Sequence, residues 1–185
     1  MTAKMELIHK LRSPDNKRVL QAIEELRANG MLKDGSLRCV PLCHVHMQGA
    51  DLVSASLVEI DFHQAHLQEA DLSNANLGGA KLNRADLRGA NFSRANLKDA
   101  DLFKADLNGA CNLTEEQLSQ AKRLYGATMP NGAVYDGRYN LAGDIKFARW
   151  GRVDVDDPQA MAEFFSVSLE IYLEGQGKEV VGSGV

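Results

Sequence analysis

The sequence predicts an all-β solenoid core closed by α-helical segments at both ends. The first observation is an apolar residue that returns every five positions over residues 37–107, which makes fifteen repeats without a break. The second is a small or apolar residue, most often alanine, two positions before each of these centres. The third is a set of helix-capping signals on either side of this run.

The five-residue period fits neither a helix nor a flat strand. In a helix, a step of five residues turns about 140° around the axis, so the leucines would spiral over every face. In a strand, residues five apart point to opposite faces. The period fits a short extended stretch such as residues 85–87, followed by a corner at Arg88 and Gly89. Repeated corners turn the chain into a coil.

Four repeats close a coil of twenty residues if each corner turns the chain by about a right angle. Successive coils then stack at about 4.8 Å through backbone pairing. The repeat region covers residues 35–111 and gives just under four coils. Its large apolar centres should fill the axis of the coil. The predicted structural core consists of Leu57, Leu67, Leu72, Leu77, Leu82, Leu87, Phe92, Leu97, Leu102 and Leu107.

The repeat unit A-[DN]-L-x-x, as in residues 70–74 (ADLSN) and 95–99 (ANLKD), resembles the pentapeptide repeat family. The resemblance implies a right-handed quadrilateral β-helix. Residues 124–132 and 164–176 also resemble C-terminal extensions of some bacterial, notably cyanobacterial, members of the family. The family serves many roles, so the resemblance predicts a fold and leaves the function open.

Residues 1–34 are expected to form a helical cap on the first coil. Residues 4–12 have the pattern of a short amphipathic helix. Ser13 followed by Pro14 has the order of an N-cap and a first helical position, which predicts a second helix over residues 14–29. The apolar stripe of this helix needs a partner, and the open end of the first coil is the nearest one.

Residues 112–175 are expected to form a C-terminal helical cap and tail. Thr114 and Gln117 have the spacing of a capping box, which predicts a helix over residues 115–124. The order Asp157–Pro158 predicts another helix start. Further helices are predicted over residues 141–150, 158–165 and 169–173, and residues 176–185 are expected to be disordered.

The C-terminal tail carries an apolar cluster that has two interpretations. It covers the last coil, or it is a surface for a partner or a second copy, because a cluster of this size is rarely left exposed on a monomer. The candidate partner residues are Phe164, Phe165, Leu169 and Tyr172.

Composition limits the compartment and the partners. The formal charge of −4 argues against direct nucleic-acid binding. No stretch of eighteen apolar residues is present, and the first ten residues lack a hydrophobic signal core. Three cysteines in no disulfide pattern suit a reducing compartment. A cytoplasmic location without membrane association is expected.

Spacing of twenty residues stacks two pairs of metal-binding side chains on adjacent outer faces of the coil. Cys43 and His63 form one pair, and His46 and His66 form the other. Sulfur and imidazole ligands suit zinc or copper. Against this, no metal-motif spacing is present, and the simpler interpretation is that these are ordinary surface residues.

A non-enzymatic scaffold for protein–protein interaction is the function that we expect, with no cofactor. No Ser/His/Asp arrangement or glycine-rich phosphate loop is present. The partner should be another protein, and the chain should be a monomer or a homodimer through its C-terminal tail. One alternative, which the resemblance implies, is a DNA-mimic modulator of DNA gyrase, although nine acids against seven bases give residues 35–110 a charge of only −2. A second alternative is metal binding.

Overall fold

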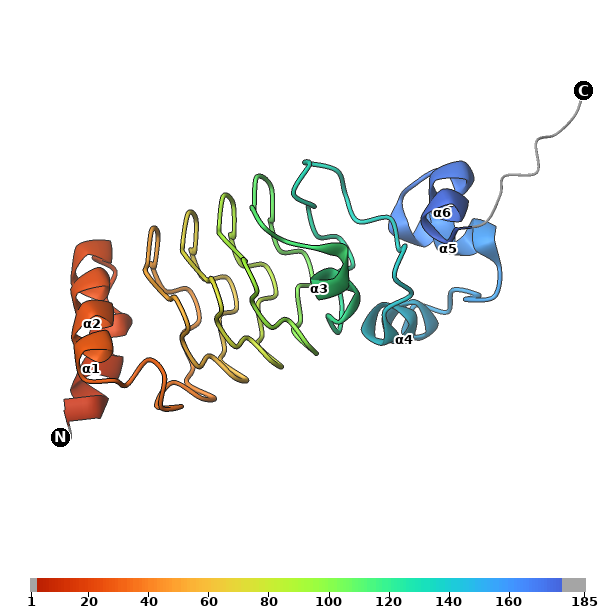
Figure 1. Cartoon of the computed structure of the whole chain (residues 1–185). Helices are drawn as coiled ribbons and strands as arrows, with labels where there is room; N and C mark the ends of the chain where they lie inside the picture. The colour runs from red at the N-terminus through yellow and green to blue at the C-terminus, as the bar shows by residue number, and fades with distance from the viewer. Residues whose placement is uncertain (1–2, 178–185) are drawn as a thin grey trace, which may run out of the picture.

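Two helices, a stack of short coils and four further helices follow one another along the chain in the computed structural model, which describes residues 3–177 (Figure 1). No helix in this described part is long and apolar enough to span a bilayer. The helices are α1 (Ala3–Leu11), α2 (Asn16–Ala28), α3 (Glu115–Ser119), α4 (Ala142–Trp150), α5 (Pro158–Phe165) and α6 (Leu169–Gly175).

The middle of the chain forms a stack of coils, here called the repeat stack, in which each coil uses twenty residues. Isolated parallel bridges join residues twenty positions apart, as between Asp71 and Asn91. Two backbone hydrogen bonds, both of 2.9 Å, join the coils that contain Asp71 and Asn91. Leu72 N donates to Asn91 O, and Asn91 N donates to Ala70 O. Figure 1 shows the coils lying side by side between α2 and α3. The coil length expected from four repeats is therefore present.

The predicted all-β class is wrong, because residues 3–177 contain no extended β-strand. Each pairing between coils is an isolated bridge. A few residues after each bridge the backbone turns a corner, with positive φ values of 59°, 54° and 58° at Ser54, Glu59 and Arg84. The corner interrupts pairing every five residues, before a ladder can lengthen into a strand. Helices are the only regular secondary structure longer than one residue in the described chain.

The Asp or Asn of each repeat holds the corner in place. The side chain of Asp71 accepts a hydrogen bond from the backbone amide of Ser73 at 2.9 Å, and Asn96 accepts one from Lys98 at 3.0 Å. The same contact recurs at other repeats along the stack. Asp and Asn are the residues whose short side chains close such turns. This contact explains their place in the repeat unit.

The axis of the repeat stack is filled by the large apolar centres and by alanine. Each of the ten centres predicted as core has at most 1% of its surface exposed. The alanines beside them, from Ala50 to Ala105, are buried as well. Small side chains suit the narrow space beside the large centres, although Ile60 at the same repeat position is buried too. These ten residues are Leu57, Leu67, Leu72, Leu77, Leu82, Leu87, Phe92, Leu97, Leu102 and Leu107.

Helices α1 and α2 lie at the N-terminal end of the stack (Figure 1). Helix α1 matches the predicted helix to within one residue, but α2 begins later than expected, at Asn16. Its N-cap is Asp15, whose carboxylate accepts from the amide of Lys17 at 3.0 Å. Ser13, the predicted N-cap, accepts from the amide of Asp15 instead. Two favoured capping residues stand two places apart, and the one nearer the helix caps it.

Side chains of the helical segment satisfy carbonyl groups on the open edge of the first coil. A coil edge without such donors would leave backbone acceptors without partners. The donors and acceptors are Arg12 Nε to Pro41 O (3.1 Å), Asn16 Nδ2 to Gln48 O (3.1 Å) and Arg27 Nη2 to Asp51 O (2.8 Å).

The stack continues beyond residue 111 with a shift of two residues. Parallel bridges join Asp101 to Arg123 and Asp106 to Thr128, a spacing of twenty-two rather than twenty. Helix α3 sits in this longer connection and ends at Ser119, five residues before the predicted end. The predicted capping box between Thr114 and Gln117 is confirmed. The chain after α3 therefore returns to the coil instead of extending the helix.

Helices α4, α5 and α6 complete the C-terminal part. Each lies where the capping signals and apolar pattern predicted it, with α5 starting after the Asp157 N-cap. Helix α6 extends two residues further than predicted, to Gly175. The predicted disorder of residues 176–185 concerns mainly residues 178–185, which lie outside the described residues.

Candidate functional site

Aromatic side chains join the C-terminal helices to the last coil. Tyr125 of this coil lies with its ring centroid 5.1 Å from that of Phe147 in α4 and 4.4 Å from that of Phe164 in α5. Phe165 meets the buried Tyr135 edge to face at 5.6 Å. Such ring pairs add stabilisation beyond the area that they bury. The helices are therefore fixed to the stack by a continuous aromatic cluster.

The residues predicted as a partner surface lie mostly inside this cluster. Phe165 and Tyr172 are 4% and 6% exposed, and Phe164 is partly buried. Leu169, with 36% of its surface exposed, is the one of the four that remains at the surface. Most of the apolar tail thus packs over the end of the stack.

Close packing at Gly137 sets the position of α5. A Cβ atom at Gly137 would lie 2.4 Å from the ring of Phe165, and the φ of Gly137 is +85°, in the left-handed region. Only glycine satisfies both conditions. The segment that leaves the stack consequently packs directly against Phe165 of α5.

Arg138 lies beside this contact and is held by a buried carboxylate. Its Nε donates to Asp136 Oδ1 at 3.1 Å and its Nη2 donates to Asp136 Oδ2 at 2.8 Å. Asp136 is 6% exposed. The Nη1 atom of Arg138 also lies 3.6 Å from Oε1 of Glu115, the first residue of α3. The hydrogen bond to Asp136 raises the pKa of the Arg138 guanidinium, so this group is a fixed positive charge.

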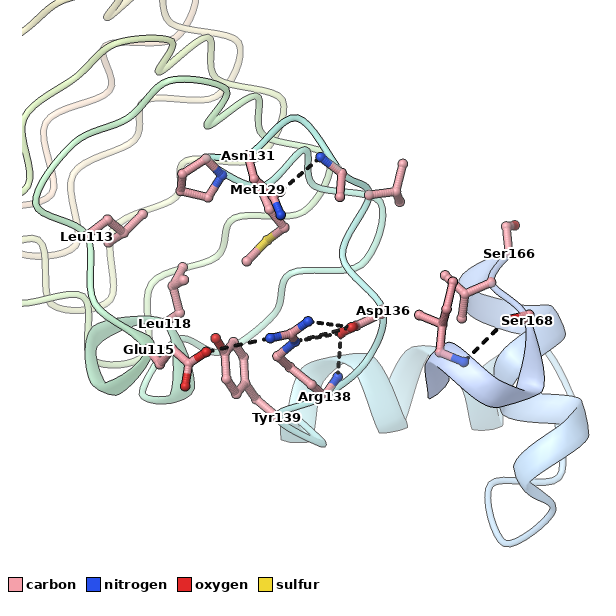
Figure 2. A pocket seen from close by; sticks show the side chains of 15 residues that line it. Leu113, Glu115, Leu118, Met129, Asn131, Asp136, Arg138, Tyr139, Ser166 and Ser168 are labelled. Carbon is pink, nitrogen blue, oxygen red and sulfur yellow. Dashed lines mark hydrogen bonds and ion pairs between the residues drawn. The ribbon is translucent and has the colours of Figure 1, made fainter. Parts of the chain in front are cut away.

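A groove of about 670 Å³ opens between the end of the stack, α3 and α6 (Figure 2). A second hollow of about 500 Å³ shares Arg138 and Ile171 with it and extends the groove along α6. Val134 and Ile171 are 53% and 47% exposed at its walls, which is high for large apolar side chains. Its apolar lining consists of Leu113, Leu118, Met129, Val134, Val167 and Ile171, with Pro130 and Ala133.

The polar groups of the groove give it a negative charge. Glu115, Asp136 and Glu174 are three carboxylates, and Arg138 is the single cation among the lining residues, so the net charge is −2. The side chain of Glu115 is 78% exposed and reaches into solvent at the rim. The arrangement offers apolar contacts in the groove and attraction for a cation at its edge.

A family model for pentapeptide repeats matches residues 46–84 and 70–109. Residues 46–109 belong to the pentapeptide repeat family. No curated protein matches the chain significantly. The match covers all but the first repeats of the stack and stops before the groove.

Three solved structures are similar to about half of this chain. HetL, a pentapeptide repeat protein involved in heterocyst differentiation regulation in the cyanobacterium Nostoc, is 42% identical over 51% of this chain and 43% of its own, with a TM-score of 0.47. A pentapeptide repeat protein from the Arabidopsis thaliana thylakoid lumen is 30% identical over 50% and 60%, with a TM-score of 0.42. One from the cyanobacterium Cyanothece is 31% identical over 52% and 65%, with a TM-score of 0.28. The chain thus matches less than two thirds of each.

The candidate metal ligands lie on the pentapeptide repeat coils, away from the groove. His46 and His66 stack with ring centroids 4.8 Å apart and planes 1° from parallel. His63 Nδ1 contacts the side chain of Asn83. Partial desolvation beside Asp61 raises the pKa of the Cys43 thiol, which disfavours the thiolate that a metal requires. No group of three or more metal-binding side chains comes together within residues 3–177.

Sequence reasoning missed the groove because its walls come from distant segments. Val134, Arg138 and Ile171 belong to the turn after the last coil, the following loop and α6. Residues 135–138 lie outside the predicted helices and the five-residue repeats. The order Asp136-Gly137-Arg138 does carry a local signal, since Asp136 also accepts the amide of Arg138 at 3.1 Å in a tight turn. That signal marks a turn but says nothing of a groove.

Proposed function

We propose that this chain is a non-enzymatic scaffold that binds another protein through the groove beside α6. The observation that carries the proposal is the exposure of Val134 and Ile171 on the walls of a preformed hollow of about 670 Å³. Exposed large apolar side chains around a concave surface are typical of binding sites.

The walls of the groove are rigid, which favours binding. Asp136 holds Arg138 by several hydrogen bonds, and Gly137 packs directly on Phe165. On the α3 side, Leu118 is buried in the core. A surface that is already ordered loses little conformational entropy when a partner binds.

The groove selects a short apolar segment that carries a basic residue. Apolar side chains of the partner would cover Val134 and Ile171. A lysine or arginine would face Glu115 and Glu174, where the net charge of the lining is −2. An acidic segment would be repelled at the same rim.

DNA mimicry is supported less well, because the acids of the repeat stack are largely paired. Six of the nine acids over residues 35–110 have a basic partner within 4.0 Å. A duplex mimic needs rows of unpaired negative charge. The paired acids are Asp51, Glu59, Asp61, Asp86, Asp101 and Asp106.

Binding of labelled peptides to the purified full chain tests the proposal. The panel consists of short apolar peptides that are matched except for a central Lys, Ala or Glu, measured by fluorescence anisotropy. We expect the Lys peptides to bind best and both Val134→Glu and Ile171→Glu to weaken them at least about tenfold. Leu169→Glu, also on α6 but outside the groove lining, is the matched control.

Two results would overturn the proposal. One is that no peptide of the panel binds. The other is that Ile171→Glu binds as well as the unchanged chain while its circular dichroism spectrum is native, since the groove would then take no part in recognition.

A further inference from the structure

We propose that residues 146–157, the end of α4 and the loop that follows, form a self-complementary surface through which two copies of this chain associate. This segment is called the Trp150 surface. Trp150 is the single tryptophan of the chain, and 80% of its surface is exposed. Tryptophan is the residue with most to gain from burial and is frequent at the centres of interfaces. The surface shares no residue with the groove lining, so the inference is independent of the proposed function.

The exposed ring of Trp150 has a fixed support on one side. It stacks on Phe147 with centroids 6.0 Å apart and planes 12° from parallel, and Phe147 in turn packs on Tyr125 of the last coil. Helix α4 itself is fixed to the coil, because Gly143 N donates to Lys122 O at 3.0 Å. The indole is therefore held beside Phe147, while most of its surface faces solvent.

Charged residues flank Trp150 along the chain in two groups of opposite sign. Lys146 lies one helical turn before Trp150 and is exposed on the same side of α4. Arg149, next to Trp150 in the sequence, is exposed as well. Arg152 follows directly after the helix and is also exposed. The exposed acids Asp154, Asp156 and Asp157 come next along the chain.

None of these six charged side chains forms an ion pair within 4.0 Å inside the described part of the chain. The carboxylates of Asp154 and Asp157 accept only from nearby backbone amides, those of Asp156 and Gln159. By contrast, Arg88, Arg123 and Arg138 each have a carboxylate partner within 2.8 Å.

A second copy fits these charges better than any partner of a single sign. Residues 146–157 contain three bases followed by three acids, a net charge of zero. An acidic protein, an anionic membrane or a nucleic acid would meet the three acids, and a basic partner would meet the three bases. A two-fold axis through Trp150 places the bases of one copy against the acids of the other twice over. The indole rings would then cover each other at the centre.

The contact is small, which predicts a weak and reversible dimer. One short helix face and a loop bury less than the ~800 Å² per partner of a standard stable interface. We expect a dissociation constant on the order of 10 μM at low salt, rising with ionic strength as exposed ion pairs are screened.

Sedimentation velocity together with tryptophan emission on the full chain tests the inference. We expect the sedimentation coefficient to increase, and the emission to shift to the blue, as the protein concentration rises to about 200 μM. Two charge-reversed variants, Arg149→Glu/Arg152→Glu and Asp154→Lys/Asp156→Lys, should each remain monomeric. Their equimolar mixture should dimerise again, because the reversed charges then face each other. Arg84→Glu/Arg94→Glu, at unpaired arginines exposed on the stack, should behave like the unchanged chain.

Three outcomes would overturn the inference. The first is a monomer at all concentrations with unshifted emission. The second is a dimer that both charge-reversed variants still form, since it would use another surface. The third is a blue shift on adding poly-glutamate or vesicles of anionic lipid to a chain that does not self-associate, since the natural partner would then be acidic.

Discussion

The carboxylate of Asp144 accepts a hydrogen bond from the backbone amide of Tyr125 at 2.9 Å, and this contact joins α4 to the edge of the last coil. The same carboxylate accepts from the amide of Leu124 at 3.2 Å. Asp144 is fully buried. It supplies acceptors for two amides that have no further coil to pair with, so the acid ends the repeat stack at this side.

Replacing Asp144 should change how stability depends on pH. Burial raises the pKa of Asp144 from 3.8 to about 6 despite the two hydrogen bonds. The folded state therefore binds this proton more tightly than the unfolded state. The stabilisation is complete below about pH 4 and is lost as the pH rises through about 6, a change of about 3 kcal/mol in the free energy of unfolding.

Urea unfolding of the unchanged chain and of Asp144→Asn between pH 4 and pH 7.5 measures this effect. Asparagine does not titrate, but its side-chain oxygen can still accept the hydrogen bond from the Tyr125 amide. The stability of Asp144→Asn relative to the unchanged chain should therefore improve as the pH rises. Taking the difference cancels the other carboxyl groups. A constant difference across this range would contradict the raised pKa.

Gly143→Ala should loosen α4 from the stack. A Cβ atom at Gly143 would lie 2.5 Å from the carbonyl oxygen of Lys122, and that oxygen belongs to rigid backbone. We expect a loss of about 1–3 kcal/mol, as for overpacking in a fixed core, together with faster hydrogen exchange at the Tyr125 amide. Gly151→Ala at the other end of α4, where the nearest atom is 3.4 Å from the added Cβ, is the control and should be tolerated. Equal stability of the two variants would show that α4 can move away without cost.

Gln117 should matter more as a donor than as a helix cap. Its Nε2 donates to Phe92 O and Ala95 O, both at 2.8 Å, while its Oε1 accepts the amide of Thr114 at 2.8 Å. Gln117→Glu keeps the acceptor but places a carboxylate oxygen against two carbonyls. We expect thermal and urea unfolding to show a loss of about 2–4 kcal/mol at pH 7.

The exposed Gln120→Glu serves as the control for the added charge. It should change stability by less than about 0.5 kcal/mol. If Gln117→Glu is as stable as this control, the capping box alone accounts for the role of Gln117.

The sequence predicted best what depends on neighbouring residues. The five-residue period identified the side chains that fill the axis, such as Leu77 and Leu87, because burial of a coil interior is a direct consequence of that period. The Thr114 capping box and the Asp157 N-cap were also visible, because a cap and the amide that it binds lie within three residues.

What the sequence could not show depends on where the chain returns after an interruption. Helix α3 adds two residues to the coil, so Arg123 pairs with Asp101 at a spacing that the five-residue count does not contain. Asp144 has the sequence position of an ordinary acid in a first helical turn, and only the return of α4 onto the coil buries it. The groove has the same origin, since Val134 and Ile171 meet through tertiary packing alone. The all-β class failed because each corner follows its bridge too closely for a strand to form.

Arg27→Ala should open the N-terminal end of the stack. The Nη2 atom of Arg27 donates to the carbonyl and to the carboxylate of Asp51 at 2.8 and 2.6 Å, and its Nη1 lies 3.5 Å from Val53 O. Its removal leaves carbonyls on the edge of the first coil without donors from α2. We expect a loss of about 1.5–3 kcal/mol and faster exchange of amides in the first coil, with later coils unaffected.

Arg18→Ala is the control that separates the hydrogen bonds of Arg27 to the coil edge from the loss of a surface charge. Arg18 is on the same helix, is 76% exposed and lies 3.5 Å from Asp15, so its removal should cost less than about 0.5 kcal/mol. Arg27→Lys keeps the charge but cannot donate to three oxygens from one planar group. Its loss of stability should therefore lie between those of Arg27→Ala and Arg18→Ala. If Arg27→Lys matches the unchanged chain, charge near Asp51 is sufficient and hydrogen bonding to the coil edge is not what holds α2 in place.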